Sequence, residues 1–142
     1  DSTDVTPERD RFEHLALDIC TAESLPALGV CRGLQLLNVH CGGGLISVDG
    51  HVARSHPVVL DTEFFRGCTE SILANSFHGF GIDDSCISTS LKPIAWAQDG
   101  TIEAAIHDTL PHFGIMWHPE RERSTTEYDL LMIQAAFGDG QQ

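Results

Sequence analysis

A cysteine flanked by glycines, at the junction of an apolar run and a helical pattern, constrains this chain more than any other feature. Residues 26–30 are mainly apolar and lead into Cys31, after which apolar residues recur at helical spacing from Leu34. This pattern predicts a strand, a sharp turn and a helix. Gly29 and Gly33 lie two residues on either side of Cys31, where the absence of a side chain lets a strand and a helix approach closely. We therefore expect Cys31 to occupy a nucleophile elbow.

The chemistry of such a corner follows from its position at a helix N-terminus. A thiol there lies at the positive end of the helix dipole, so we expect the pKa of Cys31 to fall and its thiolate to react near neutral pH. The backbone N–H of Arg32 follows the nucleophile and is expected to donate to an oxyanion. Taken alone, the motif fits a small buried cysteine in a strand-to-helix connection equally well.

Length and charge restrict the classes of function. A chain of 142 residues predicts one domain, residues 1–142, with a core of its own. The net charge of -13, from 21 acidic and 8 basic residues, argues against a nucleic-acid partner and against an anionic membrane surface. The five cysteines include no C-x-x-C pair, which argues against a disulfide framework or a zinc site and favours a reducing compartment, the cytoplasm.

Periodicity and turn residues divide the chain into helices and strands. Residues 6–8 predict a helix start, and apolar spacing extends this helix to about residue 23 as an amphipathic element packed on a sheet. Residues 124–127 predict a capping box that opens a last helix ending near residue 137. Asp99-Gly100 predicts a hairpin. Short strands are expected at residues 26–30, 45–47, 58–60, 71–74, 87–90, 94–97, 102–106 and 113–117.

Two polar stretches are predicted as loops. Residues 75–81 mix polar, aromatic and glycine residues where a strand gives way to a loop, and loops of this kind tend to carry function. Residues 49–57 favour a solvated or lid-like loop over a metal or phosphate site, although they contain two histidines and an arginine, namely His51, Arg54 and His56. Glu103 alternates with apolar neighbours, which suggests an acid that supports the site from behind. We expect residues 1–4 not to be a signal peptide and residues 139–142 to be frayed.

A second motif, His118-Pro119-Glu120, follows the strand predicted at residues 113–117. Proline ends the hydrogen-bond ladder and restricts the backbone, so His118 and Glu120 should stand clear of the sheet at a set separation. A cysteine on an elbow, a distant histidine and a carboxylate two residues beyond it are typical of the nucleophile, base and orienting acid of acyl transfer. His118 alone is equally compatible with a structural histidine, but its combination with Cys31 favours catalysis.

Residues 29–35 and 114–120 together resemble the class I glutamine amidotransferase superfamily, which includes the γ-glutamyl hydrolases of peptidase family C26. The resemblance covers nearly the whole chain. It implies an α/β, flavodoxin-like fold with a mostly parallel central sheet flanked by helices and a small antiparallel hairpin. It further implies no cofactor, no metal and four residue roles: Cys31 as nucleophile, His118 as general base and acid, Glu120 as its partner and the Arg32 N–H as an oxyanion donor.

Other segments are more similar to particular members of the superfamily. Arg32 together with residues 75–78 resembles stand-alone hydrolases of γ-glutamyl amides, and residues 99–104 and 113–118 strengthen the likeness to hydrolases of γ-glutamyl-CDP-amidate. The resemblance implies a small-molecule substrate split into glutamate and cytidine diphosphoramidate, as in capsule modification. It implies substrate contacts from Gln35, Asn75, Ser76 and His78, and leaves Arg32, Arg54, Arg121 and Arg123 as candidates to meet the phosphate charge.

Two other functions stay open. One is a glutaminase subunit that delivers ammonia to a synthetase partner, and the other is a non-catalytic, amidotransferase-like binding module. A homodimer is compatible with any of these.

The superfamily resemblance is incomplete at the start of the chain. The resemblance implies a fold that begins with additional βα units and a Gly-Gly loop that supplies a second oxyanion donor, and we expect this sequence to start after that loop. We expect N-terminal βα units to be missing, roughly 50–60 residues at about 30 per unit. Loss of one oxyanion donor typically costs about 3 kcal/mol of transition-state stabilisation. The chain alone is therefore expected to be poorly stable or inactive unless another segment supplies that part.

Overall fold

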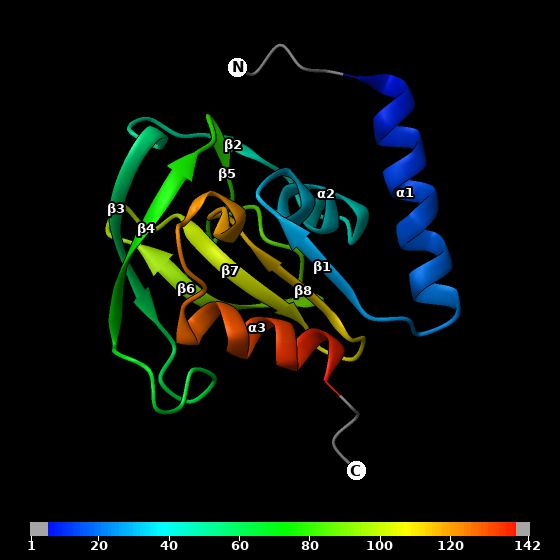
Figure 1. Ribbon diagram of the computed structural model, residues 1–142. Helices are drawn as coiled ribbons and strands as arrows, with labels where there is room; N and C mark the ends of the chain where they lie inside the picture. Colours follow the sequence, from blue (N-terminus) through cyan, green and yellow to red (C-terminus); the bar gives the residue numbers. More distant parts are fainter. Residues whose placement is uncertain (1–5, 139–142) are drawn as a thin grey trace.

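The computed structural model describes residues 6–138, so the expectations for residues 1–4 and 139–142 lie outside the described part. A six-stranded sheet, in the order β1-β8-β7-β6-β3-β4, forms its centre and is flanked by helices (Figure 1). The expected α/β class is thereby confirmed. The strands of this sheet are β1 (Ala27–Val30), β3 (Val52–Leu60), β4 (Ser71–Phe77), β6 (Leu91–Ala97), β7 (Ile102–His107) and β8 (His112–Ile115).

The helices and a small second sheet complete the described chain. The helices are α1 (Pro7–Ala22), α2 (Arg32–His40), α3 (Glu127–Phe137) and a short 3-10 helix at Pro119–Arg121. Strands β2 (Ile46–Ser47) and β5 (Phe80–Gly81) pair antiparallel in a separate two-stranded sheet. None of the helices within residues 6–138 has both the length and the apolar character that a membrane crossing requires.

The main sheet is less parallel than expected. Among the described residues, β1 and β8 form the one parallel pair, and the other four pairs are antiparallel. The reason is the length of the connections, because a parallel pair needs a long crossover whereas β6, β7 and β8 follow one another through short turns. The hairpin predicted at Asp99-Gly100 is confirmed as the β6–β7 turn, with Gly100 at φ 89°.

Helices α2 and α3 cover opposite faces of the sheet. Successive residues of a strand point to opposite sides, and Ala104 and Ala105 of β7 accordingly belong to different apolar clusters. Ala104 packs in the cluster that contains Met132 of α3, whereas Ala105 packs in the cluster that contains Leu34 and Leu37 of α2. Burial on both faces therefore fixes the register of the central strands.

Helix α1 forms as predicted but is not packed on the sheet. It contacts α2 at the margin of the molecule, and none of its residues is buried (Figure 1). Its apolar residues Phe12, Leu15 and Ile19 are 72%, 57% and 51% exposed. The apolar spacing was read correctly as a helix, whereas its expected packing against the sheet is wrong, because β1 at the adjacent sheet edge is covered by α2 instead.

Two other local expectations are also wrong. Residues 52–57, expected in a loop, extend β3, which pairs with β4 along nearly its whole length. Residues 87–90, expected as a strand, form turns, because polar contacts hold Ser88: its N–H donates to Asn38 Oδ1 at 2.7 Å and its hydroxyl to Cys41 O at 2.7 Å. Tertiary contacts override the local pattern in both places.

The last helix is anchored by one buried acid. The capping box expected at residues 124–127 lies two residues later, where the Thr126 and Asp129 side chains each accept from the other's backbone N–H. Asp129 is only 2% exposed and also accepts a hydrogen bond from Trp117 Nε1 at 3.0 Å. The carboxylate thus satisfies the helix start and an indole N–H of the core at the same time.

We expect Asp129→Ala to lower the free energy of unfolding by about 2–4 kcal/mol, since it removes the cap and leaves the buried Trp117 N–H without a partner. Urea denaturation followed by tryptophan fluorescence measures the loss. Glu127→Ala, an exposed acid in the same first turn, is the control and should cost less than about 1 kcal/mol. Equal losses in the two variants would contradict this account.

Candidate active site

The parallel pairing of β1 and β8 brings the two chemical motifs together. In the register, Val30 lies opposite Ile115, and the N–H of Cys31 continues the ladder by donating to Ile115 O at 2.7 Å. Parallel strands end at the same edge of a sheet, so the residues that follow them meet there. Cys31 follows β1, and His118 follows β8.

Cys31 occupies a strained corner between β1 and α2. Its φ and ψ are 53° and -103°, a conformation rarely adopted by a residue with a side chain. The predicted strand, sharp turn and helix are therefore confirmed. Only one of the two glycines serves the close approach: a Cβ on Gly29 would lie 2.4 Å from the carbonyl carbon of Gly33, whereas a Cβ on Gly33 would meet nothing within 4 Å.

We expect the two glycines to respond differently to alanine. Gly29→Ala would press against helix backbone, which cannot move aside, and should cost about 3 kcal/mol or more of unfolding free energy. Gly33→Ala adds a methyl in open space within α2 and should be neutral or stabilising by up to about 1 kcal/mol. Thermal denaturation of both variants compares them directly, and similar losses would argue against the close approach.

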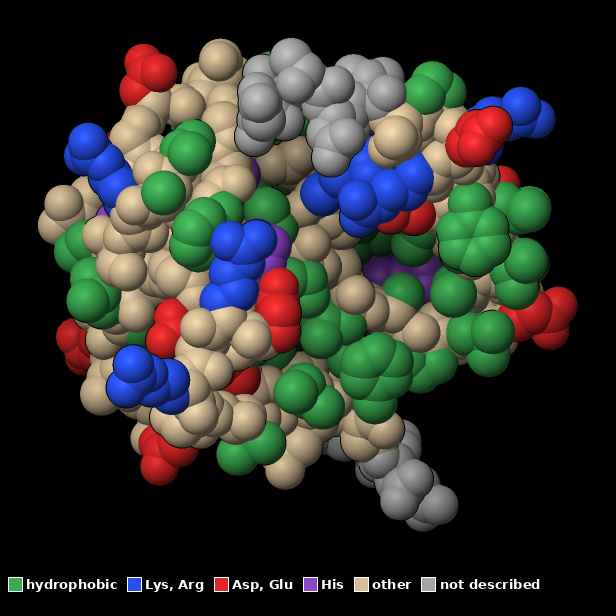
Figure 2. Space-filling model, turned by 45° about the horizontal axis from the view of Figure 1, so that its top comes forward, with side chains coloured by type: hydrophobic (Ala, Val, Ile, Leu, Met, Phe, Trp, Pro, Cys, Tyr) green, Lys and Arg blue, Asp and Glu red, His purple; other side chains and the backbone are tan. Residues whose placement is uncertain are grey.

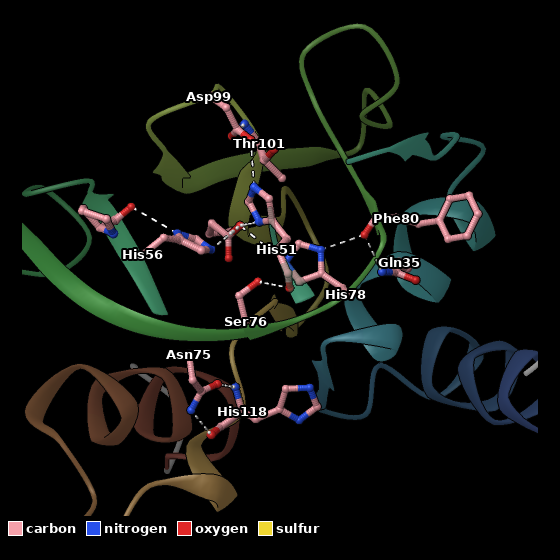
Figure 3. A network of polar contacts seen from close by, with 12 residues as sticks. Gln35, His51, His56, Asn75, Ser76, His78, Phe80, Asp99, Thr101 and His118 are labelled. Atoms are coloured by element: carbon pink, nitrogen blue, oxygen red, sulfur yellow. Dashed lines mark hydrogen bonds and ion pairs between the residues drawn. The ribbon is translucent and has the colours of Figure 1, made fainter. Parts of the chain in front are cut away.

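His118 is held from two sides. Its Nδ1 lies 2.6 Å from Glu120 Oε1, and its ring packs edge-on to Phe77 with the centroids 5.7 Å apart. Asn75 fixes its backbone, because Asn75 Nδ2 donates to His118 O at 2.9 Å and Asn75 Oδ1 accepts from His118 N at 2.8 Å (Figure 3). Partial burial is the largest single influence and raises the pKa of Glu120. The hydrogen bond to His118, a backbone hydrogen bond and the nearby positive charges together outweigh it, so this pKa lies below its ordinary value.

Both motifs open onto one cleft. Its volume is about 630 Å³, and its walls come from α1, the elbow, the residues after β4 and the residues after β8. Histidine and arginine side chains gather at hollows on this face of the molecule (Figure 2). The lining residues that carry the chemistry are Cys31, Arg32, Gln35, His78, His118 and Arg121.

The four residues expected to bind substrate divide into two pairs. Gln35 and His78 line the cleft, and Gln35 Nε2 and His78 Nδ1 lie 2.9 and 2.8 Å from the carbonyl oxygen of Phe80 (Figure 3). Asn75 and Ser76 do not line it. Both are buried. Asn75 hydrogen-bonds the backbone of His118 and donates to Glu122 Oε1 at 2.6 Å, and Ser76 donates to His51 O at 2.7 Å. These two side chains thus hold neighbouring residues, and a substrate contact from either one stays a prediction.

The four arginines considered for phosphate contact differ in their charge partners and in whether they line the cleft. The Arg32 guanidinium pairs with Asp10 and lies 3.5 Å from Glu13 Oε2, so acids on α1 compensate its charge. Arg121 lines the cleft and stacks over the Phe77 ring at 4.0 Å, and within residues 6–138 it makes no ion pair. Arg54 and Arg123 are exposed and are not part of the cleft wall.

The expectation for the Cys31 thiol is wrong in direction. Burial raises its pKa, and the negative charges of Glu103 and Glu120 add to this effect. The Arg32 N–H and the Arg121 charge lower the pKa but do not compensate. The helix N-terminus was visible in the sequence, whereas the 8% exposure of Cys31 and the nearby carboxylates arise only from tertiary packing.

We expect the rate at which iodoacetamide alkylates Cys31 to keep rising with pH above the range in which a free thiol titrates. Because the folded state holds this proton more tightly, the thiol contributes stability below the unfolded pKa that is lost as pH rises through the folded pKa. Peptide mass spectrometry reads the rate at Cys31 across pH, with the urea-unfolded chain as reference. A profile that levels off below the unfolded reference would refute the raised pKa.

Comparison with known proteins agrees with this architecture. The family model named Peptidase C26 matches residues 1–120. The chain is 33% identical over 127 residues to the gamma-glutamyl-CDP-amidate hydrolase of Campylobacter jejuni, covering 89% of this chain and 58% of that protein. It is also 33% identical over 143 residues to the glutamine amidotransferase-like protein YvdE of Lactococcus lactis, covering 90% and 60%.

A solved structure shares the fold. The crystal structure of a glutamine amido transferase from Methylobacillus flagellatus superimposes with a TM-score of 0.68 at 20% identity, covering 84% of this chain and 48% of that one. The chain thus spans less than two thirds of the length of each of these three proteins.

Proposed function

Because this chain belongs to the peptidase C26 family, we propose that it carries the cysteine, histidine and acid of a γ-glutamyl amide hydrolase. The observation that carries the proposal is geometric: Cys31 and His118 end adjacent parallel strands and line one cleft, and Glu120 holds His118. The activity of the Campylobacter jejuni relative supports a γ-glutamyl substrate.

In the first half of the proposed reaction, Cys31 becomes acylated. Burial keeps its thiol protonated at rest, so attack on the γ-carbonyl carbon requires transfer of that proton to His118. The N–H of Arg32 is positioned after the nucleophile to donate to the oxyanion. His118 then protonates the leaving nitrogen, the C–N bond breaks, and a γ-glutamyl thioester remains on Cys31.

In the second half, water releases glutamate. His118 removes a proton from water, which attacks the thioester carbonyl, and the C–S bond breaks as the Cys31 sulfur regains a proton. Glu120 keeps the His118 ring in one orientation, so the same imidazole serves both half-reactions. Gln35 and His78 stand at the cleft wall as the proposed contacts of the glutamyl group.

The finer proposal concerns the leaving group. A cytidine diphosphoramidate is anionic and needs a cation in a chain whose net charge is -13. Arg121 supports this choice, because it lines the cleft and pairs with no carboxylate among residues 6–138. The cysteine usage supports a cytoplasmic location for the reaction.

The decisive experiment is release of glutamate from a panel of γ-glutamyl amides, γ-glutamyl-CDP-amidate included. We expect Cys31→Ala to abolish release. Glu120→Gln should lower kcat by about 10- to 1,000-fold with KM little changed, since the Glu120 side chain hydrogen-bonds His118 and is not part of the cleft lining. Glu63→Gln, an exposed acid outside the cleft, is the control and should retain full activity. Release that survives Cys31→Ala would eliminate the mechanism.

A glutaminase subunit is the second candidate, favoured by one observation. The exposed apolar residues Phe12, Leu15 and Ile19 of α1 are the kind of surface a protein partner covers. Glutamine turnover that rises only with a synthetase present would support it over the hydrolase. An absence of any adduct on Cys31 after treatment with a glutamine-analogue electrophile would instead favour a non-catalytic binding module.

A further inference from the structure

Three histidines and a glutamate converge in the interior of the protein. One of them, His78, lies between the other members of this cluster and Phe80. His51 precedes β3, His56 lies within it, His78 follows β4, and Glu103 lies in β7. The side chains of His51, His78 and Glu103 are only 5%, 2% and 0% exposed, and that of His56 is 16% exposed. The segment expected as a solvated loop therefore contributes two of these side chains to a buried cluster.

Every inward-facing atom of the cluster lacks a hydrogen bond. His51 Nδ1, His56 Nε2, His78 Nε2 and both carboxylate oxygens of Glu103 are buried, and none has a hydrogen-bond partner within the described chain. Five such atoms in one place would destabilise the fold if nothing lay between them, because a buried polar group without a partner loses its hydration and gains no hydrogen bond in return.

The spacing of these atoms is that of ligands around an ion. Glu103 Oε1 lies 3.4 Å from His51 Nδ1, 3.6 Å from His56 Nε2 and 3.7 Å from His78 Nε2. A shared proton would draw a nitrogen and an oxygen to about 2.7–2.9 Å. Ligands about 2.0–2.1 Å from a tetrahedral zinc are instead about 3.4 Å apart. One ligand atom from each residue lies within 4.8 Å of all the others.

The outward-facing ring nitrogens are already held. His51 Nε2 lies 2.8 Å from Asp99 Oδ2, His78 Nδ1 lies 2.8 Å from Phe80 O, and His56 Nδ1 lies 3.3 Å from Pro57 O (Figure 3). Metal-binding histidines typically donate their second N–H to a carboxylate or a backbone carbonyl, which leaves the other nitrogen as a lone-pair donor. All three rings satisfy this condition.

We propose that His51, His56, His78 and Glu103 bind one divalent transition-metal ion, with zinc the best fit to three imidazoles and one carboxylate. Three neutral rings and one carboxylate leave a single positive charge on the bound ion, so the charge of the buried Glu103 is compensated. The site would tie β3, the segment after β4 and β7 together. It contains no sulfur and does not include the proposed nucleophile Cys31. It shares His78 with the cleft wall, so in the metal-bound chain both ring nitrogens of His78 are engaged and the proposed polar contact with the glutamyl group falls to Gln35.

The test is a cobalt titration of the purified chain after treatment with a chelator. We expect one equivalent of Co²⁺ to bind with the intense visible absorption of a four-coordinate ion, without a thiolate-to-cobalt charge-transfer band, and with displacement by Zn²⁺. Zn²⁺ should also raise the melting temperature of the chain, because an ion that binds only the folded state stabilises it.

Matched variants separate the site from adventitious binding. Glu103→Gln and His56→Gln should each weaken Co²⁺ binding at least tenfold. Asp99→Asn removes the negative charge from the outer contact of His51, while its side-chain oxygen can still accept from the N–H of Thr101, and it should weaken binding about 10- to 100-fold. His107→Gln, a histidine of β7 outside the cluster, is the control and should bind as the unaltered chain does. Asp99 is 48% exposed, so its variant should fold even if substitutions in the interior do not.

The proposal is overturned if the folded, metal-free chain binds no Co²⁺. It is also overturned if binding shows a thiolate band that disappears in Cys31→Ala, or if Asp99→Asn and His107→Gln bind equally well. None of these readouts depends on hydrolase activity, so a failure here leaves the proposed acyl transfer untouched.

Discussion

The parallel pairing of β1 with β8 is the contact on which the candidate site depends. It is the one parallel pair among the described strands, and its last hydrogen bond is donated by Cys31 itself. A slip of that register by one residue would invert the faces of β1 and carry the thiol away from the end of β8. The elbow and the histidine lie more than eighty residues apart in the chain, and the two-strand ladder brings them to the same edge of the sheet.

Around that ladder, polar side chains that do not face the cleft do much of the positioning. Asn75 of β4 hydrogen-bonds the backbone N–H and C=O of His118, and Glu120 orients the His118 ring. Ser76 holds the carbonyl of His51, which also accepts from the N–H of His78. The interior of β4 is therefore polar by necessity. The Ser76 hydroxyl is satisfied by a backbone carbonyl, and the Asn75 amide is satisfied by the backbone of His118 and the carboxylate of Glu122.

The sequence predicted the features that depend on local chemistry. The glycine-flanked corner, the Asp99-Gly100 hairpin and most helix and strand positions follow from turn residues and apolar spacing, and the structure has them. What the sequence did not reveal depends on packing: the direction of the Cys31 pKa, the burial of Asn75 and Ser76, and the strand at residues 52–57. His51 and His56 looked like loop residues because their partners, His78 and Glu103, are distant in the chain. The contact of Phe77 with His118 was missed for the same reason, since these two residues are also distant in the chain.

The carbonyl oxygen of Phe80 is shared by two neighbours with unrelated tasks. It accepts from Gln35 on the elbow helix, and it meets His78 from the buried cluster. An oxygen has only two lone pairs, so this peptide group has no capacity left for solvent or for a third partner. The cleft wall and the interior cluster are consequently linked through a single carbonyl group, so a shift of that group would disturb the Gln35 contact and the His78 contact at once.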